Sequence, residues 1–193
     1  GTGSILSDLL WEYALLKHTS EDLQTLLAAW CGAYPSLAAK FMLSGDVAKS
    51  PSRISSALCT ALARLPSSPK QVLYNLISSY TPTYNDNIGR LVIGRPELST
   101  GDILRAAGTY ESRSAKRAGI LTTLLQTRQD ALTEEALYAI AELSAPGMMV
   151  YHVCDHPLVT GDIVVYYYQK AKQQGADSTL LAYLEQRLMR AIG

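Results

Sequence analysis

Apolar residues recur every three or four positions in many stretches of this chain, which is the spacing of one face of an α-helix. The stretches with this spacing are 5–17, 52–65, 112–127 and about 178–191, together with the segments that follow Ser20, Pro69, Thr100 and Thr133. Short breaks that contain Pro or Gly separate them, and no clear β-hairpin signal interrupts the series. This pattern predicts an all-α protein of roughly nine to eleven helices.

The polar positions repeat as well, in a short phrase that opens the predicted helices. A hydroxyl residue is followed by a Gly or acid, an acid and an apolar residue, at positions 20–23, 44–47, 100–103, 133–136 and 160–163, with a degenerate copy at 69–72. A Ser or Thr at a helix start accepts a hydrogen bond from an unpaired amide, and acids there suit the helix dipole. The last positions of the phrases lie 24, 25, 31, 33 and 27 residues apart. Such spacing is typical of a protein built from stacked repeats.

Three stretches are less regular. Residues 80–98 contain several Pro, Asn and Gly residues and are predicted to form a loop with a short turn around 88–93. Residues 163–168 are β-prone, but we predict a helix over 161–174 because the opening phrase matches and polar residues continue it. Residues 148–154 are also β-prone, and periodicity does not decide whether 148–156 is strand, helix or loop.

The stretch from Ser55 to Leu104 carries the repeat pattern best, in the segments SALCTALARLPSSPKQVLYNLI and RLVIGRPELSTGDILRAA. These segments resemble the HEAT-like helical repeats, in which a helix that ends in a basic residue is followed by a Pro turn and a second helix. The period is closest to that of the leucine-rich variant repeats of bacterial proteins. The resemblance covers about half of the chain. It implies a curved α-solenoid whose exposed face binds a partner protein or, in some relatives, nucleic acid, and it brings no catalytic residues. Capping signals are generic, so an irregular globular helical bundle is the alternative.

Composition narrows the class of protein. The 193 residues are 48% hydrophobic and 18% charged, which is typical of an ordered globular chain. The 17 basic side chains balance 17 acidic ones, and no apolar run reaches the length of a membrane span. We therefore expect no membrane insertion and no strong bulk attraction to nucleic acid. We expect a single helical-repeat domain over 5–193, complete or part of a longer protein, after a cloning remnant at 1–4.

The cysteine and glycine patterns bear on compartment and cofactors. Three widely separated cysteines do not form a disulfide framework, which favours a reducing compartment, either the cytoplasm or the interior of a cell after delivery. The sequence has neither a phosphate-binding loop nor a dinucleotide-binding glycine pattern, so we expect no cofactor.

The segment from Arg90 to Arg128 is basic, with seven cations against three carboxylates. Arg113, Lys116 and Arg117 share one face of a predicted helix because they are three and four positions apart. Such a face can contact phosphates or an acidic partner, and the alternative is an ordinary solvated helix surface.

Tyrosine is abundant, with 12 Tyr against one Phe. Tyr166, Tyr167 and Tyr168 cannot all face inward on a helix, whose successive positions differ by about 100°. At least one ring should therefore be exposed, and Tyr is common at binding surfaces. The alternative is that each hydroxyl only reaches water at the edge of the core.

The cluster from His152 to His156 could hold a metal ion if it were extended, or pair Cys154 with His156 as a nucleophile and base. A structural zinc site needs four ligands, and the chain offers no second Cys/His pair, so we expect no metal. The alternative is a turn with a small buried cysteine.

Together these patterns predict a non-enzymatic protein–protein interaction module or scaffold that presents Tyr and Arg side chains on a helical array. The candidate contacts are Arg113, Lys116, Arg117, Tyr166, Tyr167 and Tyr168. Nucleic-acid binding through residues 90–128 is the second hypothesis. A small hydrolase or metal protein centred on Cys154 and His156 is the third.

Overall fold

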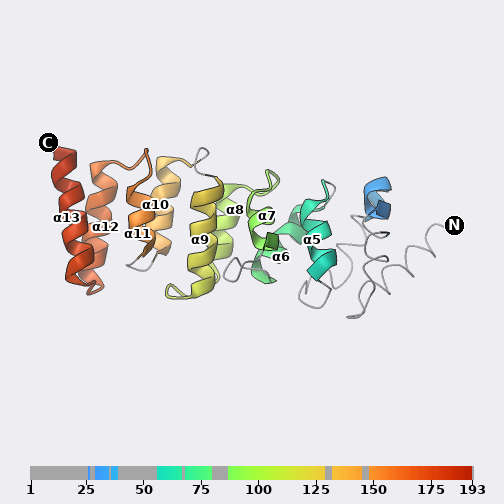
Figure 1. Ribbon diagram of the computed structural model, residues 1–193, viewed down its shortest axis with the longest axis horizontal. Helices are drawn as coiled ribbons and strands as arrows, with labels where there is room; N and C mark the ends of the chain where they lie inside the picture. The colour runs from blue at the N-terminus through green and yellow to red at the C-terminus, as the bar shows by residue number, and fades with distance from the viewer. Residues whose placement is uncertain are drawn as a thin grey trace. The chain divides into compact units, whose positions relative to one another are not determined.

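The computed structural model describes residues 26, 29–34, 36–38, 56–66, 68–79, 87–128, 132–144 and 148–192. Every regular element in these residues is an α-helix, which confirms the all-α class (Figure 1). Beyond the short helical stretches at 29–33 and 36–38, the helices are α5 (Ser56–Arg64), α6 (Lys70–Ser79), α7 (Asn87–Ile93), α8 (Thr100–Gly108), α9 (Ala115–Thr127), α10 (Glu134–Leu143), α11 (Met148–Cys154), α12 (Gly161–Gln173) and α13 (Ser178–Ile192). They form two compact units, Gly1–Leu98 and Ser99–Gly193.

Several predicted helices are present where the apolar spacing places them. The helices expected over 52–65, 112–127, 161–174 and 178–191 correspond to α5, α9, α12 and α13, and those expected after Pro69, Thr100 and Thr133 correspond to α6, α8 and α10. The helix expected over 5–17 and the phrases at 20–23 and 44–47 lie outside the described residues. The expectation of one continuous repeat domain over 5–193 stays a prediction.

Two segments that the periodicity left as a turn or undecided are helical. The predicted turn around 88–93 is helix α7, which buries Ile88, Val92 and Ile93. The β-prone run at 148–154 is helix α11, which buries Val150 and Val153 together with the cysteine that follows. In each helix one buried residue is followed three or four positions later by two adjacent buried residues, which is the spacing of one helix face, so packing against other helices overrides local β preference.

The starts of α8, α10 and α12 follow the predicted capping chemistry only in part. Helix α8 is capped by Ser99 rather than Thr100: the Ser99 hydroxyl accepts from the Asp102 amide at 3.0 Å, and the Asp102 carboxylate accepts from the Ser99 amide at 2.9 Å. This reciprocal pair satisfies two amides that would otherwise lack partners. Thr133 caps α10 through the Ala136 amide at 3.1 Å, whereas Thr160 precedes α12 without a side-chain hydrogen bond.

In the first unit, α5, α6 and α7 pack against one another. These helices have only 7 to 10 residues each, and isolated helices of this length are marginal in water. Their stability therefore comes from the side chains that they bury together, and the largest fully buried ones are Leu62, Leu73, Leu76, Ile77 and Ile93.

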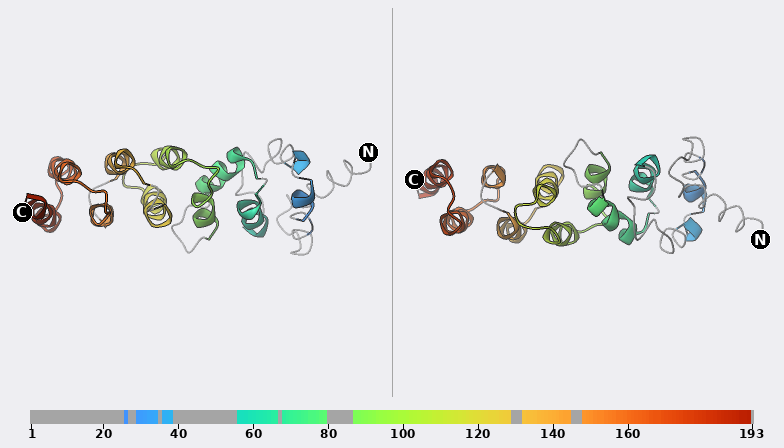
Figure 2. Two further views of the ribbon diagram at one scale, coloured as in Figure 1. Left: turned by 90° about the horizontal axis from the view of Figure 1, so that it is seen from above. Right: turned by 90° about the horizontal axis from the view of Figure 1, so that it is seen from below.

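In the second unit, each helix packs against its neighbour in sequence or the next helix but one. The contacts join α8 to α9 and α10, α11 to α9 and α10, and α12 to α10 and α13. Viewed along their axes, α8, α10 and α12 form one row and α9, α11 and α13 form the other (Figure 2). The residues buried between the rows include Ile103, Leu121, Leu137, Val153 and Leu184.

Candidate functional site

The three consecutive tyrosines of α12 point to three different surroundings, as their spacing around a helix requires. Tyr166 donates a hydrogen bond to the Glu142 carboxylate of α10. Tyr167 is only 2% exposed, because it belongs to the buried stripe of α12, and burial raises the pKa of its hydroxyl. Tyr168 donates to Glu185 of α13 at 3.0 Å. A partner can therefore contact Tyr166 and Tyr168 in this fold, while Tyr167 stabilises the core.

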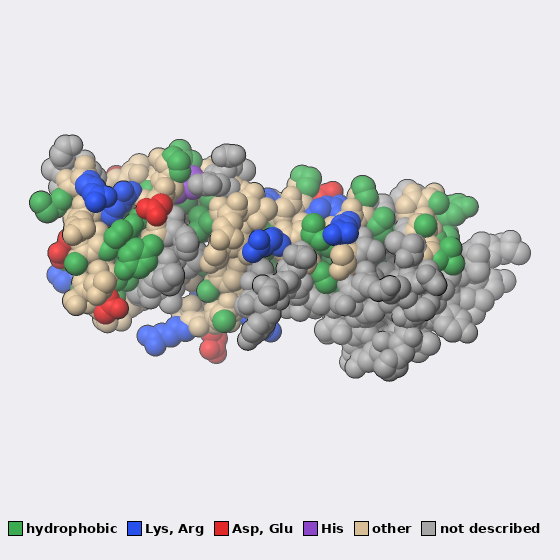
Figure 3. All heavy atoms as spheres, viewed as in Figure 1, with side chains coloured by type: hydrophobic (Ala, Val, Ile, Leu, Met, Phe, Trp, Pro, Cys, Tyr) green, Lys and Arg blue, Asp and Glu red, His purple; other side chains and the backbone are tan. Residues whose placement is uncertain are grey.

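The outward side of α12 lines an open groove of about 630 Å³. Its lining residues share one face of the helix and are Val165, Tyr168, Gln169, Lys172 and Gln173. Val165 is 39% exposed, and the Lys172 ammonium lies 5.7 Å from the centre of the Tyr168 ring. The groove thus combines apolar surface, two amides and one cation. On the face drawn in Figure 3, hydrophobic side chains gather over the C-terminal helices, with charged side chains near them.

The basic face predicted on α9 is divided by the structure. Arg113 and Lys116 are exposed, and the Lys116 ammonium lies 5.6 Å from the centre of the Tyr110 ring. Arg117 is half-buried and donates to the main-chain oxygens of Ala107 and Leu143, both at 3.1 Å. Arg117 is therefore engaged in holding helix ends and is not exposed with the other two cations.

The candidate contacts also lie on different helices. Arg113 precedes α9 and Lys116 is in its first turn, and α9 packs against α8 and α11. Tyr166 and Tyr168 lie on α12, which packs against α10 and α13. The structure thus gives two separate exposed sets of candidate contacts.

Cationic side chains that bind helix ends are a recurring feature that the sequence did not reveal. Lys170 of α12 donates to the carbonyls of Ala141 and Glu142 at the end of α10, and Arg187 of α13 donates to the carbonyl of Cys154 at the end of α11. The last carbonyls of a helix lack partners within the helix and carry partial negative charge. A cation from another helix therefore satisfies them and fixes the two helices together.

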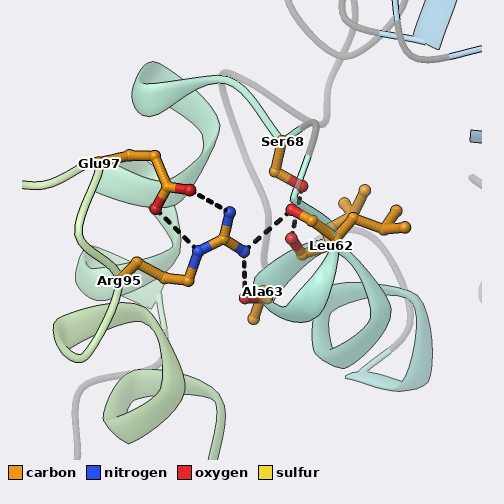
Figure 4. Close-up of polar contacts among 6 residues, drawn as sticks. Leu62, Ala63, Ser68, Arg95 and Glu97 are labelled. Atoms are coloured by element: carbon orange, nitrogen blue, oxygen red, sulfur yellow. Dashed lines mark hydrogen bonds and ion pairs between the residues drawn. The ribbon is translucent and has the colours of Figure 1, made fainter. Parts of the chain in front are cut away.

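The first unit contains the most complete example (Figure 4). Arg95 donates to the carbonyls of Ala63 and Leu65 at 2.8 and 2.9 Å, and its other nitrogens donate to Glu97. The Arg95 side chain is only 12% exposed. The hydrogen bond from Arg95 lowers the pKa of the Glu97 carboxyl. In this cluster Arg95 joins the end of α5 to the turn after α7.

The cluster from His152 to His156 is a helix end followed by a turn. Cys154 ends α11, so the extended arrangement that would align three ligands is absent from this segment. Burial raises the pKa of the Cys154 thiol to about 11, which leaves little thiolate at neutral pH. His156 is buried, and its Nδ1 accepts from the Leu158 amide at 3.2 Å. Among the side chains that the structure describes, no three His, Cys, Asp or Glu residues are grouped to hold a metal ion; the His152 side chain is outside that set.

Comparison with known proteins adds no relative. No protein-family model, curated protein or solved structure matches the chain. Among the described helices, none is both long enough and apolar enough to cross a membrane.

Proposed function

We propose that this protein is a non-enzymatic protein–protein interaction module built as a HEAT-like α-solenoid. The packing of the second unit supports this proposal, because each helix there contacts its sequence neighbour or the next but one. In a stacked-repeat protein every repeat contacts only adjacent repeats. A rigid array of this kind holds surface side chains in place, so binding requires little reorganisation.

The helix-end cations give a second line of support. Arg95, Lys170 and Arg187 reach back over 28 to 33 residues to the carbonyls that they bind. Arg117 differs, because it reaches back 10 residues to Ala107 and forward 26 residues to Leu143. The opening phrases of the helices lie 24 to 33 residues apart. Contacts at similar sequence separations are expected when one structural unit repeats along a chain.

The groove along α12 is the observation that carries the choice of binding surface. Val165 adds exposed apolar surface to the groove, on a helix that buries Ile163, Val164, Tyr167 and Ala171. Interfaces combine an apolar and aromatic centre with a polar rim. Tyr168 supplies the aromatic ring, and Gln169 and Lys172 supply the rim.

Affinity capture from native cells tests this proposal. Val165→Glu places a charge in the groove, and Met189→Glu makes the same kind of change at a residue of α13 that is 73% exposed. We expect at least one protein to be captured by the wild type and by Met189→Glu but lost with Val165→Glu. Identical captured proteins for all three would contradict the proposed surface, provided that circular dichroism shows equal folding.

Nucleic-acid binding is the second candidate, and the exposure of Arg113 and Lys116 favours it. Three other cations of the 90–128 segment are already engaged within the protein: Arg95 and Arg117 bind carbonyls, and Arg105 pairs with Asp102 at 2.9 Å. Fewer cations therefore remain for phosphates than the sequence offers, which is why we rank this function second.

A further inference from the structure

On the side of α12 that lies opposite Tyr168, α12 and α10 together form a second aromatic surface. The rings of Tyr138 and Tyr166 meet edge to face, with centroids 5.7 Å apart and an angle of 82° between the planes. Both residues are half-buried, so each ring packs against its partner and still reaches solvent. Because α10 and α12 are in contact, the pair lies on one continuous face.

Carboxylates surround this tyrosine pair. Tyr166 donates to Glu142, and the charges of Asp162 and Glu134 act on the Tyr138 hydroxyl, where they add to burial in raising its pKa. All three carboxylates are exposed. The nearby cation, Lys170, is turned toward the carbonyls at the end of α10. The face therefore presents three carboxylates around two aromatic rings, and one of them, Glu142, also interacts electrostatically with Lys170.

Helix stability explains only part of this charge. Glu134 and Asp162 lie in the first turns of α10 and α12, where a carboxylate favours the helix. Glu142 lies in the last turn of α10, where the helix dipole disfavours a negative charge. The Glu142 carboxylate accepts a hydrogen bond from the Tyr166 hydroxyl across the face, and this contact accounts for its position.

We propose, building on the function proposed above, that this α10–α12 face binds a basic segment of the partner protein. An arginine of that segment lies against the Tyr138–Tyr166 pair and is paired by Glu134, Glu142 and Asp162. A guanidinium is attracted both to an aromatic face and to carboxylates, so the two interactions favour binding together. The tyrosine rings also supply a contact shielded from water, which exposed carboxylates alone do not supply. The partner is thus a protein with an exposed arginine-bearing segment.

The probe is a short fluorescein-labelled peptide with arginine at alternate positions, compared with the same peptide carrying neutral citrulline. We expect low-salt fluorescence anisotropy to show binding of the arginine peptide only. The triple variant Glu134→Gln, Glu142→Gln and Asp162→Asn should weaken binding by about tenfold, because three exposed charges each contribute modestly. The single change Tyr138→Leu keeps the apolar packing and should weaken binding by about threefold.

The other flank of α12 provides a matched control. Glu185→Gln removes the carboxylate that accepts a hydrogen bond from a tyrosine of α12 on the side facing α13, and it should alter binding by less than about twofold. Equal binding of the two peptides, or equal losses at the two flanks, overturns the inference. This outcome is distinct from failure of the proposed function, because capture that depends on Val165 would persist.

Discussion

Replacing Arg95 with methionine removes the cation that joins α5 to the turn after α7 while keeping a long side chain. The change leaves the Ala63 and Leu65 carbonyls without the donors that lie 2.8 and 2.9 Å away. Hydrogen bonds to a charged group contribute about 1.5–3 kcal/mol each. Because the side chain is only 12% exposed, water replaces these bonds poorly. We therefore expect the free energy of unfolding of the first unit to fall by about 2–4 kcal/mol.

The Arg95–Glu97 pair provides the control. Glu97 has a side chain that is 37% exposed, and exposed ion pairs contribute about 0–1 kcal/mol. The variant Glu97→Gln should therefore lose less than about 1 kcal/mol. Arg95→Lys should fall between the two, because one ammonium cannot reproduce the planar fork that reaches both carbonyls and the carboxylate.

Urea denaturation followed by tryptophan fluorescence measures the effect. Both tryptophans, Trp11 and Trp30, belong to the Gly1–Leu98 unit, so their signal reports that unit even if the two units unfold separately. The loss for Arg95→Met should lower the midpoint by about 1–2 M urea. A midpoint within experimental error of that of Glu97→Gln would refute the role assigned to the carbonyl contacts.

The remaining predictions concern the second unit. Lys170→Met should lower the free energy of unfolding by about 1–3 kcal/mol in urea denaturation followed by circular dichroism, whereas the same change at exposed Lys172 should have little effect. Cys154 should resist thiol reagents in the native protein and react after unfolding, as measured by mass spectrometry. The pKa of the Cys154 thiol is raised from 9.0 to about 11 in the folded state, so its contribution to the free energy of unfolding is present below pH 9 and is lost as the pH rises toward 11. The urea midpoint of Cys154→Ala should therefore change less than that of the wild type between about pH 9 and 11. If the protein binds nucleic acid, Arg113→Ala with Lys116→Ala should abolish a salt-sensitive mobility shift, and an unchanged shift would exclude this pair.

The helix positions were accessible from sequence because amphipathic spacing is a local property. Helix α12 covers nearly the predicted 161–174 despite its β-prone centre, since the opening phrase and polar continuation agreed with each other. The run that became α11 lacked such a phrase. Its helical state depends on the burial of Val150 and Val153 by other helices, which no local pattern records.

The surroundings of the three consecutive tyrosines of α12 could be predicted from the sequence only in part. The spacing around a helix correctly required that they diverge, and the buried residue could have been identified. Ile163, Val164, Tyr167 and Ala171 form one apolar stripe at helical spacing, and the structure buries all four. What the sequence could not provide was the partner of each remaining hydroxyl, because Glu142 and Glu185 lie on other helices.

The cations show why the number of basic residues in a segment of sequence overestimates the number that a partner can contact. Each helix ends in carbonyls that need donors, and the neighbouring helix is the nearest source of a long cation. Arg117 and Lys170 are used in this way, whereas Arg113 and Lys116 remain exposed. The number of cations available to a partner is therefore the number in the sequence minus those that hold helix ends. Neutral and acidic side chains are not lost to helix ends in this way, and they form the α12 groove, apart from Lys172, and the tyrosines and carboxylates of the α10–α12 face.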